Sequence, residues 1–406
     1  MTVTLFVTVT LLYKAMKVLT QFERKPLLFA DPEFIISCTD PAYFKSSFED
    51  IELALSQGYY LAGFLSYEAG YYFEEKLNQD KQYDFPLIYL GAYKNVRREK
   101  IKEPIGGYWL KNPRLNITPE QYSLNINAIR DYIAQGDVYQ ITYCLKLLFE
   151  FYGQPLSLYD QLLKEQPVPY PAYLQTDKFQ VLSLSPELFI KKNSTHLVTK
   201  PMKGTWPRGK SIFSDLIAPL CLKYDRKNRA ENVMIADLLR NDLGRLGARI
   251  KAPALFEVAR YKTLCQMTST VTAKVMQDVS IYKLFSAIFP SGSVTGAPKI
   301  RAMEIINELE KEQRKIYTGA IGYITPDKDI FFNIPIRTLL IENNQACLSG
   351  RQAEMGIGGG IVWDSTSEGE WNEGLLKAKF LTDIFKEPGD GSLFSEKHGD
   401  GSVFYI

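Results

Sequence analysis

Histidine is scarce in this sequence of 406 residues, which contains only His196 and His398. A Ser-His-Asp triad or a metal site built from several histidines therefore has almost nothing to draw on. Cysteines are also few, odd in number and never arranged as CxxC; they are Cys38, Cys144, Cys221, Cys265 and Cys347. This pattern favours reduced thiols in a cytoplasm over a disulfide framework or a zinc site. Any chemistry is expected to rest on glutamate, lysine and hard metal ions.

An excess of charge of either sign is missing as well. The chain has 48 Lys+Arg against 46 Asp+Glu, a net charge of +2, which leaves no polybasic surface and argues against a nucleic-acid partner. No stretch approaches the roughly 20 apolar residues of a membrane span, so no membrane partner is expected. Hydrophobic residues make up 46% of the chain, enough for a large core. The length fits two or three domains of roughly 150 residues each, or one large α/β body.

The first 16 residues, MTVTLFVTVTLLYKAM, are apolar and have no basic residue before Lys14. A secretory signal peptide would show a charged start and a small-residue cleavage site. Alternation of valine and leucine with threonine or phenylalanine predicts a β-strand; the alternative is a leader before a start at Met16. Neither is secretory, and we expect a cytoplasmic protein.

Residues 1–105 are predicted to form a β-rich N-terminal part of the fold. Strands are predicted at 27–30 and 33–37, an amphipathic helix at 46–58, and an aromatic strand-like run at 59–73. The charged segment 97–116 is broken by proline and glycine and predicts a boundary.

Residues 118–387 begin with a strong helix signal. Thr118 is a good N-cap, Pro119 suits the first helical position, Gln121 completes a capping box and Gly136 ends the helix. A strand of period two follows over 139–151, and further helices are predicted near 155–165, 228–243, 280–288, 298–313 and 368–386. Paired strands between helices predict an α+β fold of large antiparallel sheets with helices outside, as one interleaved body. The glycine-rich residues 388–406 predict a flexible tail.

One candidate site lies in GIGGGIVWDSTSEGEWNEGLLKAKF, where Glu370, Glu373 and Lys377 share a face of a predicted helix. Glycines before a helix N-terminus favour an anion, whereas two glutamates in the first turn favour a cation. A metal ion bridging to an anionic ligand satisfies both. The alternative is a helix whose acids merely offset its dipole.

Two further segments are ambiguous by themselves. Glu231 lies on a predicted amphipathic helix, RAENVMIADLLRNDLGR, whose charges are most simply solvated. Lys203 stands in KPMKGTWPRG, which predicts a turn framed by Pro201, Gly204 and Pro207. A rigid loop of this kind can position a reactive group, although most lysines are solvated.

These segments belong to a series of motifs that occur in order along the chain: SPELFI (185–190), KPMKGT (200–205), ENVMIADLLRNDLGR (231–245), PSGSVTGAPKIRAMEII (290–306), YTGAIGYI (317–324), IPIRTL (334–339) and GIGGGIVWDSTSEGEWNE (356–373). Together they resemble the chorismate-utilising enzymes, a family that includes anthranilate, aminodeoxychorismate, isochorismate and salicylate synthases. The resemblance covers roughly residues 118–387. GDVYQ (136–140) and AGFLSYEAGY (62–71) resemble the aminodeoxychorismate synthase component I branch in particular.

The resemblance implies a magnesium site. Glu231 and Glu373 match the Mg²⁺ ligands of the family, with Glu370 close by through water. Mg²⁺ suits a site of few carboxylates, several waters and an anionic substrate oxygen, here the ring carboxylate of chorismate.

The resemblance also implies how the rest of the substrate is held. Arg337 and Tyr317 match the pair that grips the enolpyruvyl carboxylate, and a planar guanidinium suits bidentate carboxylate binding. The remaining matches are anion-pocket and hydroxyl-donor positions: Lys377, Gly358, Gly360, Thr205 and Thr295. Glu187 matches the general acid that protonates the departing C4 hydroxyl, a role that burial would support by raising its pKa.

Two positions separate the branches of the family. Gln140 stands where isochorismate and salicylate synthases have a lysine that activates water, so an amine nucleophile is implied. Lys203 stands where anthranilate synthases have alanine; in the aminodeoxychorismate synthases this lysine is thought to attack C2 of chorismate. Its amine must be neutral, which burial beside Mg²⁺ would favour.

Gln266 departs from the family, since many relatives have a histidine there; the proton-donor role therefore falls to Glu187. The resemblance implies that 4-amino-4-deoxychorismate is made from chorismate and ammonia, on the route to para-aminobenzoate and folate. It also implies that a separate glutamine amidotransferase delivers the ammonia. The alternatives are anthranilate synthase component I and an inactive chorismate-binding scaffold that regulates an amidotransferase.

Overall fold

The structure, a computed structural model, describes residues 16–78, 81–99, 106–209, 211–261, 264–343 and 350–385. The predicted strand or leader before Met16 and the predicted tail at 388–406 lie outside these ranges. Within them, no helix is long and apolar enough to cross a membrane.

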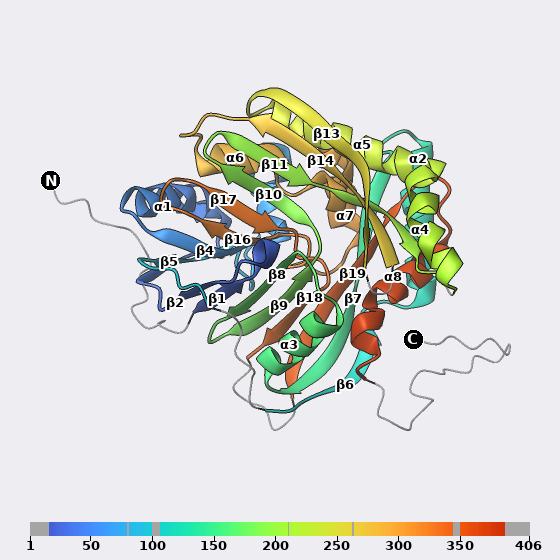
Figure 1. The fold of residues 1–406 in the computed structure, drawn as a ribbon, viewed down its shortest axis with the longest axis horizontal. Helices are drawn as coiled ribbons and strands as arrows, with labels where there is room; N and C mark the ends of the chain where they lie inside the picture. The colour runs from blue at the N-terminus through green and yellow to red at the C-terminus, as the bar shows by residue number, and fades with distance from the viewer. Residues whose placement is uncertain are drawn as a thin grey trace.

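Two large antiparallel sheets dominate the described part of the chain (Figure 1). Sheet A has nine strands. In order across the sheet they are β15 (Gly296–Ala297), β7 (Gln140–Gly153), β19 (Arg351–Ile361), β18 (Thr338–Glu342), β9 (Phe179–Ser185), β8 (Tyr170–Gln175), β1 (Lys17–Thr20) and β2 (Leu27–Ala30), with β6 (Tyr108–Leu115) also paired to β7.

Sheet B has ten strands. In order they are β12 (Met202–Pro207), β14 (Leu264–Lys274), β11 (His196–Lys200), β10 (Leu188–Asn193), β17 (Ile330–Asn333), β16 (Ala320–Ile324), β4 (Tyr60–Leu65), β5 (Ile88–Tyr93) and β3 (Phe34–Cys38), with β13 (Ala248–Arg260) also paired to β14. The α+β class with large antiparallel sheets is thus confirmed.

The N-terminal region is interleaved with the rest of the chain. Its strands β1 and β2 extend sheet A beside β8, while β4 joins sheet B directly to β16. Figure 1 shows the blue N-terminal strands next to the green and orange ones of later segments. Strands from residues 1–105 and from residues 118–387 therefore share both sheets.

Eight helices lie in the described ranges: α1 (Phe44–Ser56), α2 (Pro119–Ala134), α3 (Pro155–Glu165), α4 (Ile212–Tyr224), α5 (Arg226–Gly244), α6 (Ile281–Ile288), α7 (Lys299–Leu309) and α8 (Ser367–Thr382). Thr118 caps α2 as predicted, because its hydroxyl accepts the backbone N–H of Gln121. Helices α2 and α8 pack on each other, and α8 packs on β19. Helices α4 and α5 both lie on β12, β13 and β14.

An apolar core fills the space between the sheets. Its buried members come from β1, β2, β8 and β9 of sheet A and from β4, β5, β16 and β17 of sheet B. Aromatic rings are frequent here; Phe64, for example, stacks on Phe85 with the ring centroids 5.2 Å apart. Because helices cover the outer faces, β5 and β9 are buried at every position.

Two predictions of local structure are wrong. The strand-like run 59–73 is strand only in β4; Tyr67–Tyr72 form a 3-10 helix whose successive side chains are all buried, which a half-buried strand does not allow. The predicted turn at Lys203 is strand β12. The segment 97–116, predicted as a boundary, contains β6, whose Pro113 lies at an irregularity in the pairing with β7.

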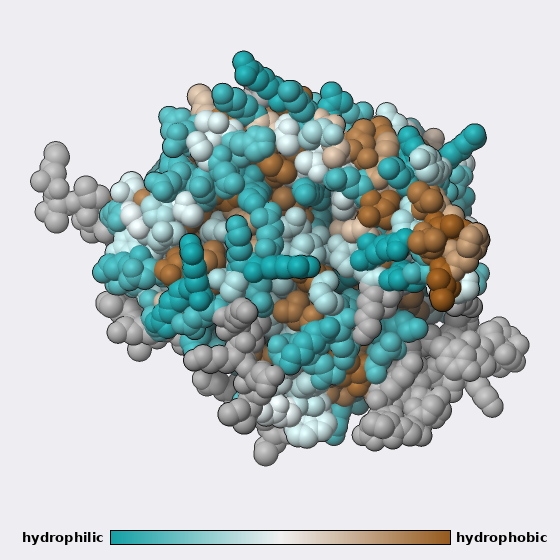
Figure 2. Space-filling model, in the orientation of Figure 1, coloured by the Kyte–Doolittle hydropathy of each residue, from teal (hydrophilic) through white to brown (hydrophobic). Residues whose placement is uncertain are grey.

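Helix α4 was not predicted, although its start carries a capping box between Ser211 and Ser214. The hydrophobic pattern does not predict α4, because the helix contains Pro219 and its exposed face is apolar. Ile212 and Phe213 are 93% and 72% exposed, and Leu216, Leu220 and Tyr224 continue the exposed stripe. Figure 2 shows hydrophobic surface on the right-hand side, where α4 lies in Figure 1.

A buried arginine ties the segments behind the sheets together. Arg314, 3% exposed, donates to the carbonyl oxygens of Thr142 (2.7 Å) and Val294 (2.9 Å) and pairs with Glu310 at 2.6 Å. Its guanidinium also lies over the Tyr67 ring, 4.3 Å from the centroid. The Arg314 side chain therefore links three segments that lie apart in the sequence, at Tyr67, Thr142 and Val294.

We expect Arg314→Met to lower the free energy of unfolding by about 3 to 5 kcal/mol, because it leaves the Glu310 carboxylate buried without its partner. Denaturant unfolding measures this. The control is Arg301→Met: Arg301 is half exposed, with surface ion pairs to Asp137 and Glu304, and a loss of about 1 kcal/mol or less is expected. Equal losses in the two variants would contradict the role given to Arg314.

Candidate active site

A cavity of about 300 Å³ opens where β12, α5, β19 and α8 meet. All but two of the residues predicted for the site line it; the exceptions are Gln140 and Thr295. The lining carries four basic side chains and four acidic ones: Lys203, Lys227, Arg337 and Lys377, and Glu187, Glu231, Glu370 and Glu373. The formal charges of the wall therefore cancel.

Lys203 reaches the cavity from an irregular stretch of β12. The pairing of β12 with β14 shifts register between Met202 and Thr205, and Gly204 has φ +101°. A bulge of this kind re-aims a side chain, and the left-handed conformation is one that glycine adopts without strain. The proline and glycine that predicted a turn thus belong to a strand distortion that points Lys203 into the site.

The amine of Lys203 lies over the backbone of β19. A Cβ atom placed on Gly360 would stand 3.1 Å from the Lys203 Nζ and would collide with the Gln140 side-chain amide. Burial lowers the pKa of Lys203, and Lys377 lowers it further, although Glu231, Glu187 and Glu373 oppose the shift. The site therefore favours a neutral amine more than water does.

Gln140 lies just behind the cavity wall. Its side chain is 1% exposed, and neither its Oε1 nor its Nε2 has a hydrogen-bond partner among the described residues. The hydroxyl of Thr142, two residues further on the same face of β7, is also buried and unpartnered, and Thr142 lines the cavity. Buried polar groups are normally paired, so these atoms are available to hydrogen-bond a polar ligand or water.

Glu187 lines the same cavity as Lys203 and is 2% exposed, and the charges of the two side chains influence each other's pKa. Its Oε1 accepts from the Ser293 hydroxyl at 2.7 Å and from the Met202 backbone N–H at 3.2 Å. Burial raises the pKa of its carboxyl to about 7, while these two hydrogen bonds and Lys203 hold it lower than burial alone would. With Oε1 engaged by two donors, Oε2 is the oxygen left to carry a proton.

Ser293 was not singled out by sequence reasoning, although it lies in the PSGSVTGAPK motif. Only the fold shows its contact with Glu187. Lys227 and Asn228, at the start of α5, also line the cavity, and no pattern in the sequence distinguishes them from other polar residues.

The acidic group lies on α5 and α8. Lys377 binds Glu373 at 2.8 Å, and Ser365 donates to Glu370 at 2.6 Å. Burial raises the pKa of Glu231 and that of Glu370, and the charge of Glu373 adds to both shifts, so the carboxylates are close enough to repel one another. The pKa of Glu373 is lowered, chiefly by Lys377.

In the described residues no group of three acidic, histidine or cysteine side chains converges on one point as metal ligands would. The acids thus form no complete cage. They fit a metal that takes one or two carboxylates and keeps several waters, which is the habit of Mg²⁺.

The glycines at 356 and 358–360 lie in strand β19, and they form the floor of the cavity. Gly358 pairs with Cys144 of β7, and its carbonyl accepts from Lys377 Nζ at 2.8 Å. The Tyr317 ring lies directly against Gly356, leaving no space for a Cβ atom. These glycines allow side chains from both sides to approach the strand.

Arg337 enters from the segment before β18 with φ +51°, a strained value for a residue with a side chain. Its Nη2 donates to Gln266 Oε1 at 3.4 Å, and burial lowers its pKa. Gln266 lies opposite Thr205 in the pairing of β14 with β12. These three residues line one wall of the cavity.

Tyr317 and Thr295 already have partners. The Tyr317 side chain is hydrogen-bonded to Cys144, and burial raises its pKa. The Thr295 hydroxyl donates to the Ser291 carbonyl at 3.0 Å, and Thr295 lies outside the cavity lining. To contact the substrate as predicted, each of these two side chains would have to give up its present hydrogen bond, to Cys144 or to Ser291.

A family model described as "chorismate binding enzyme" matches residues 101–383. Among curated relatives, the aminodeoxychorismate synthase component 1 of Escherichia coli is 38% identical over 260 residues, which are 64% of this chain and 56% of that protein. A rice (Oryza sativa subsp. japonica) protein named "Probable aminodeoxychorismate synthase, chloroplastic" is 39% identical over 276 residues, 66% of this chain and 30% of its own. The anthranilate synthase component 1 of Aquifex aeolicus is 36% identical over 273 residues, 67% of this chain and 54% of its own. The match thus spans about half or less of the length of these relatives.

Solved structures share the fold. An isochorismate synthase from Bacillus anthracis, described as specific for 2,3-dihydroxybenzoate, superposes with a TM-score of 0.75 at 16% identity, covering 91% of this chain and 96% of that one. Anthranilate synthase component I from Streptococcus pneumoniae superposes with a TM-score of 0.70 at 22% identity, covering 91% and 90%.

The raised pKa of Glu187 predicts a pH-dependent stability. Between its ordinary value of 4.5 and about 7, the folded protein binds more protons at this carboxyl than the unfolded chain does. The free energy of unfolding therefore falls as the pH rises through this window. Glu187→Gln, neutral at every pH, is expected to gain about 2 kcal/mol relative to the wild type between roughly pH 5 and pH 8.

Denaturant unfolding at the two pH values measures this gain. Asp215→Asn is the control: Arg208 holds the pKa of Asp215 at about 2, so its carboxylate stays ionised throughout the window and the difference from the wild type should not change. A Glu187→Gln difference that is the same at both pH values would contradict the buried, proton-holding carboxyl.

Proposed function

Because the chain belongs to the chorismate-binding enzyme family, we propose that it converts chorismate and ammonia to 4-amino-4-deoxychorismate, as an aminodeoxychorismate synthase component I. The observation that carries the proposal is the amine of Lys203, which lies over Gly360 in the same cavity as the protonatable carboxyl of Glu187. Replacing a hydroxyl by an amino group at the same carbon takes two successive displacements, and a covalent amine supplies the first.

In the first step the Lys203 nitrogen attacks C2 of the ring, the double bonds shift, and the C4–O bond breaks. Glu187 gives its proton to the departing oxygen, which leaves as water. The pKa of Glu187, raised to about 7 by burial, suits a proton donor near neutral pH. The attacking nitrogen loses a proton as its bond to carbon forms, and the Glu187 carboxylate, which has just given up its own proton, takes it.

In the second step ammonia attacks C4, the double bonds shift back, and the bond between C2 and Lys203 breaks. The released lysine amine takes up the proton that the new C4 nitrogen gives away, so the lysine is regenerated and the step balances. Gln140, beside Lys203 Nζ, is neutral and cannot deprotonate water, which supports an amine over a hydroxyl nucleophile at this position.

Chorismate is a dianion, whereas the wall has four charges of each sign. We propose that Mg²⁺ supplies the missing positive charge, held by Glu231 and Glu373 with Glu370 nearby through water. It would bind the ring carboxylate and stabilise charge there. Arg337 is the residue suited to the enolpyruvyl carboxylate, since its guanidinium is only weakly held by Gln266 at 3.4 Å.

The relatives are named as component 1, which supports a second component. We propose that this is a glutamine amidotransferase that supplies the ammonia, and that the product leads to para-aminobenzoate and folate. The second candidate, anthranilate synthase component I, is favoured by the Aquifex aeolicus relative at 36% identity. In that case Lys203 would take no part in the chemistry.

Mass spectrometry of the product made from chorismate and ammonium chloride tests the proposal. The expected product is 4-amino-4-deoxychorismate; anthranilate without it would contradict the proposal in favour of the second candidate. Absence of any chorismate consumption would indicate the scaffold role.

Lys203→Ala is expected to lower the rate of the 4-amino product by about 10³-fold, because the first displacement loses its nucleophile. Lys227→Ala is the matched control, since Lys227 lines the same cavity without facing Gly360. A loss of about tenfold or less is expected there. Equal rates in Lys203→Ala and the wild type would contradict the proposed covalent role of Lys203.

Removal of Mg²⁺ by a chelator is expected to raise the dissociation constant of chorismate by about tenfold or more, because the wall alone is neutral. Titration calorimetry with and without Mg²⁺ measures this. In Glu231→Gln the effect of Mg²⁺ should shrink, whereas Glu368→Gln, exposed on the first turn of α8 outside the cavity, should keep it. Chorismate affinity that is independent of Mg²⁺ would contradict the metal site.

A further inference from the structure

A buried hydrogen bond joins Ser293 to Glu187. The Ser293 hydroxyl donates to Glu187 Oε1 at 2.7 Å, and the two residues are 3% and 2% exposed. A serine hydroxyl has one proton to donate, so this bond commits it to the carboxyl. Because both residues are shielded from water, the bond is stronger than the same contact would be on the surface.

The Ser293 hydroxyl is itself held by Ser291. The two hydroxyl oxygens lie 3.0 Å apart, and since the Ser293 proton goes to Glu187, the Ser291 hydroxyl is the donor between them. The Ser291 carbonyl in turn accepts from the Thr295 hydroxyl at 3.0 Å. Thr295, which was predicted to bind substrate, thus fixes the backbone that carries Ser291.

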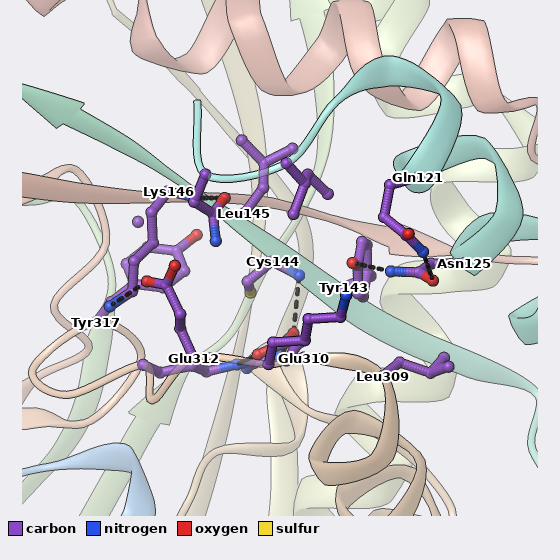
Figure 3. A pocket seen from close by; sticks show the side chains of 15 residues that line it. Gln121, Asn125, Tyr143, Cys144, Leu145, Lys146, Leu309, Glu310, Glu312 and Tyr317 are labelled. Atoms are coloured by element: carbon purple, nitrogen blue, oxygen red, sulfur yellow. Dashed lines mark hydrogen bonds and ion pairs between the residues drawn. The ribbon is translucent and has the colours of Figure 1, made fainter. Parts of the chain in front are cut away.

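The segment Gly292–Val294, a single 3-10 turn, is fixed to strand β7 through Arg314. The Arg314 guanidinium donates to the carbonyl of the last residue of this turn at 2.9 Å and pairs with Glu310 at 2.6 Å. In Figure 3 Glu310 also accepts the Cys144 backbone N–H of β7, at 2.9 Å. The turn is therefore anchored by buried polar contacts on the side away from Glu187.

The acid is fixed at its backbone as well as at its carboxyl. The Glu187 backbone N–H donates to the Ser185 hydroxyl at 3.1 Å, and its carbonyl accepts the Ile334 backbone N–H at 3.1 Å. Oε1 also accepts the backbone N–H of Met202, the residue before Lys203, at 3.2 Å. The orientation of the carboxyl is thus tied to the segment that carries the amine.

We propose that Ser293 is a positioning residue for this reaction, whose hydroxyl holds Oε1 of Glu187 so that the proton to be transferred stays on Oε2. The proposal rests on the function proposed above. Ser293 acts through Glu187, since a carboxyl that is free to turn would present its proton in several directions. The same hydrogen bond favours the ionised carboxylate and so opposes the rise in pKa that burial causes.

Ser293→Ala tests the role, because it removes the hydroxyl and adds no bulk. Glu187 donates only when protonated, so kcat falls as the pH rises through its pKa. Without a donor that favours the carboxylate this pKa rises, and the fall in kcat should move to a pH about 1 unit higher. Below the fall, kcat should be about tenfold lower than in the wild type, because the proton is no longer fixed on Oε2, while KM for chorismate stays within about twofold.

The measurement is the rate of formation of the 4-amino product from roughly pH 6 to pH 9 at a fixed concentration of free ammonia. Ser293→Thr keeps the hydroxyl and should return the fall in kcat to the wild-type pH. Ser286→Ala is the matched control: Ser286, on α6, donates to the Lys283 carbonyl at 3.0 Å, and its loss should change neither kcat nor the profile. A Ser293→Ala profile that falls at the wild-type pH, whether or not kcat is lower, would overturn the positioning role.

Unfolding provides a readout that needs no substrate. In the wild type the free energy of unfolding falls up to about pH 7, the pKa of Glu187, and in Ser293→Ala the fall should continue to a pH about 1 unit higher. A fall that ends at the same pH in both proteins would also overturn the role. The proposed function would stand in that case, since the wild type would still make the 4-amino product. A wild type that makes no such product would instead overturn the proposed function.

Discussion

The site places the Lys203 amine in a cavity lined by acidic and basic side chains, where burial lowers its pKa. In the described part of the chain, no carboxylate lies within ion-pair distance of Lys203 Nζ, although Glu231, Glu187 and Glu373 all influence its pKa. Other side chains engage two of the acids in the site: Lys377 forms an ion pair with Glu373, and the Ser365 hydroxyl donates a hydrogen bond to Glu370. Gln140, the neutral neighbour of this amine, does not oppose the lowering of its pKa. A carboxylate in its place would raise the lysine pKa and disfavour the neutral amine that the proposed function needs.

The backbone of β19 leaves room for the side chains around it. Its glycines let the side chains of Tyr317, Gln140 and Lys203 approach the strand closely. A Cβ atom on Gly356 would collide with Tyr317, and one on Gly360 would collide with Gln140 and crowd Lys203. Pairing with β7 along the whole length of β19 keeps the strand rigid despite the glycines. The floor of the site is therefore set by main-chain hydrogen bonds, while its chemistry comes from side chains on neighbouring elements.

Sequence patterns predicted much of this arrangement. Period and capping signals located α2, α3, α5 and α6, and the ordered motifs identified Lys203, Glu187 and the acids of α5 and α8 as neighbours in the fold. What the patterns missed depends on contacts between distant segments. The bulge of β12 has the composition of a turn, and only its pairing with β14 makes it a strand. Ser293 becomes notable through its bond to Glu187, and Arg314 through its bonds to the carbonyl oxygens of Thr142 and Val294, which lie on other segments of the chain.

The place of β4 in sheet B has a consequence for how the chain can be cut. The family match begins at residue 101, yet β16 inside that match is hydrogen-bonded on one side to β4 from residue 60 onward. A fragment that starts at the family boundary would expose the main-chain N–H and C=O groups of β16, an apolar strand, to other molecules. Bare strands of this kind pair with copies of themselves, so such a fragment would aggregate even with every active-site residue present.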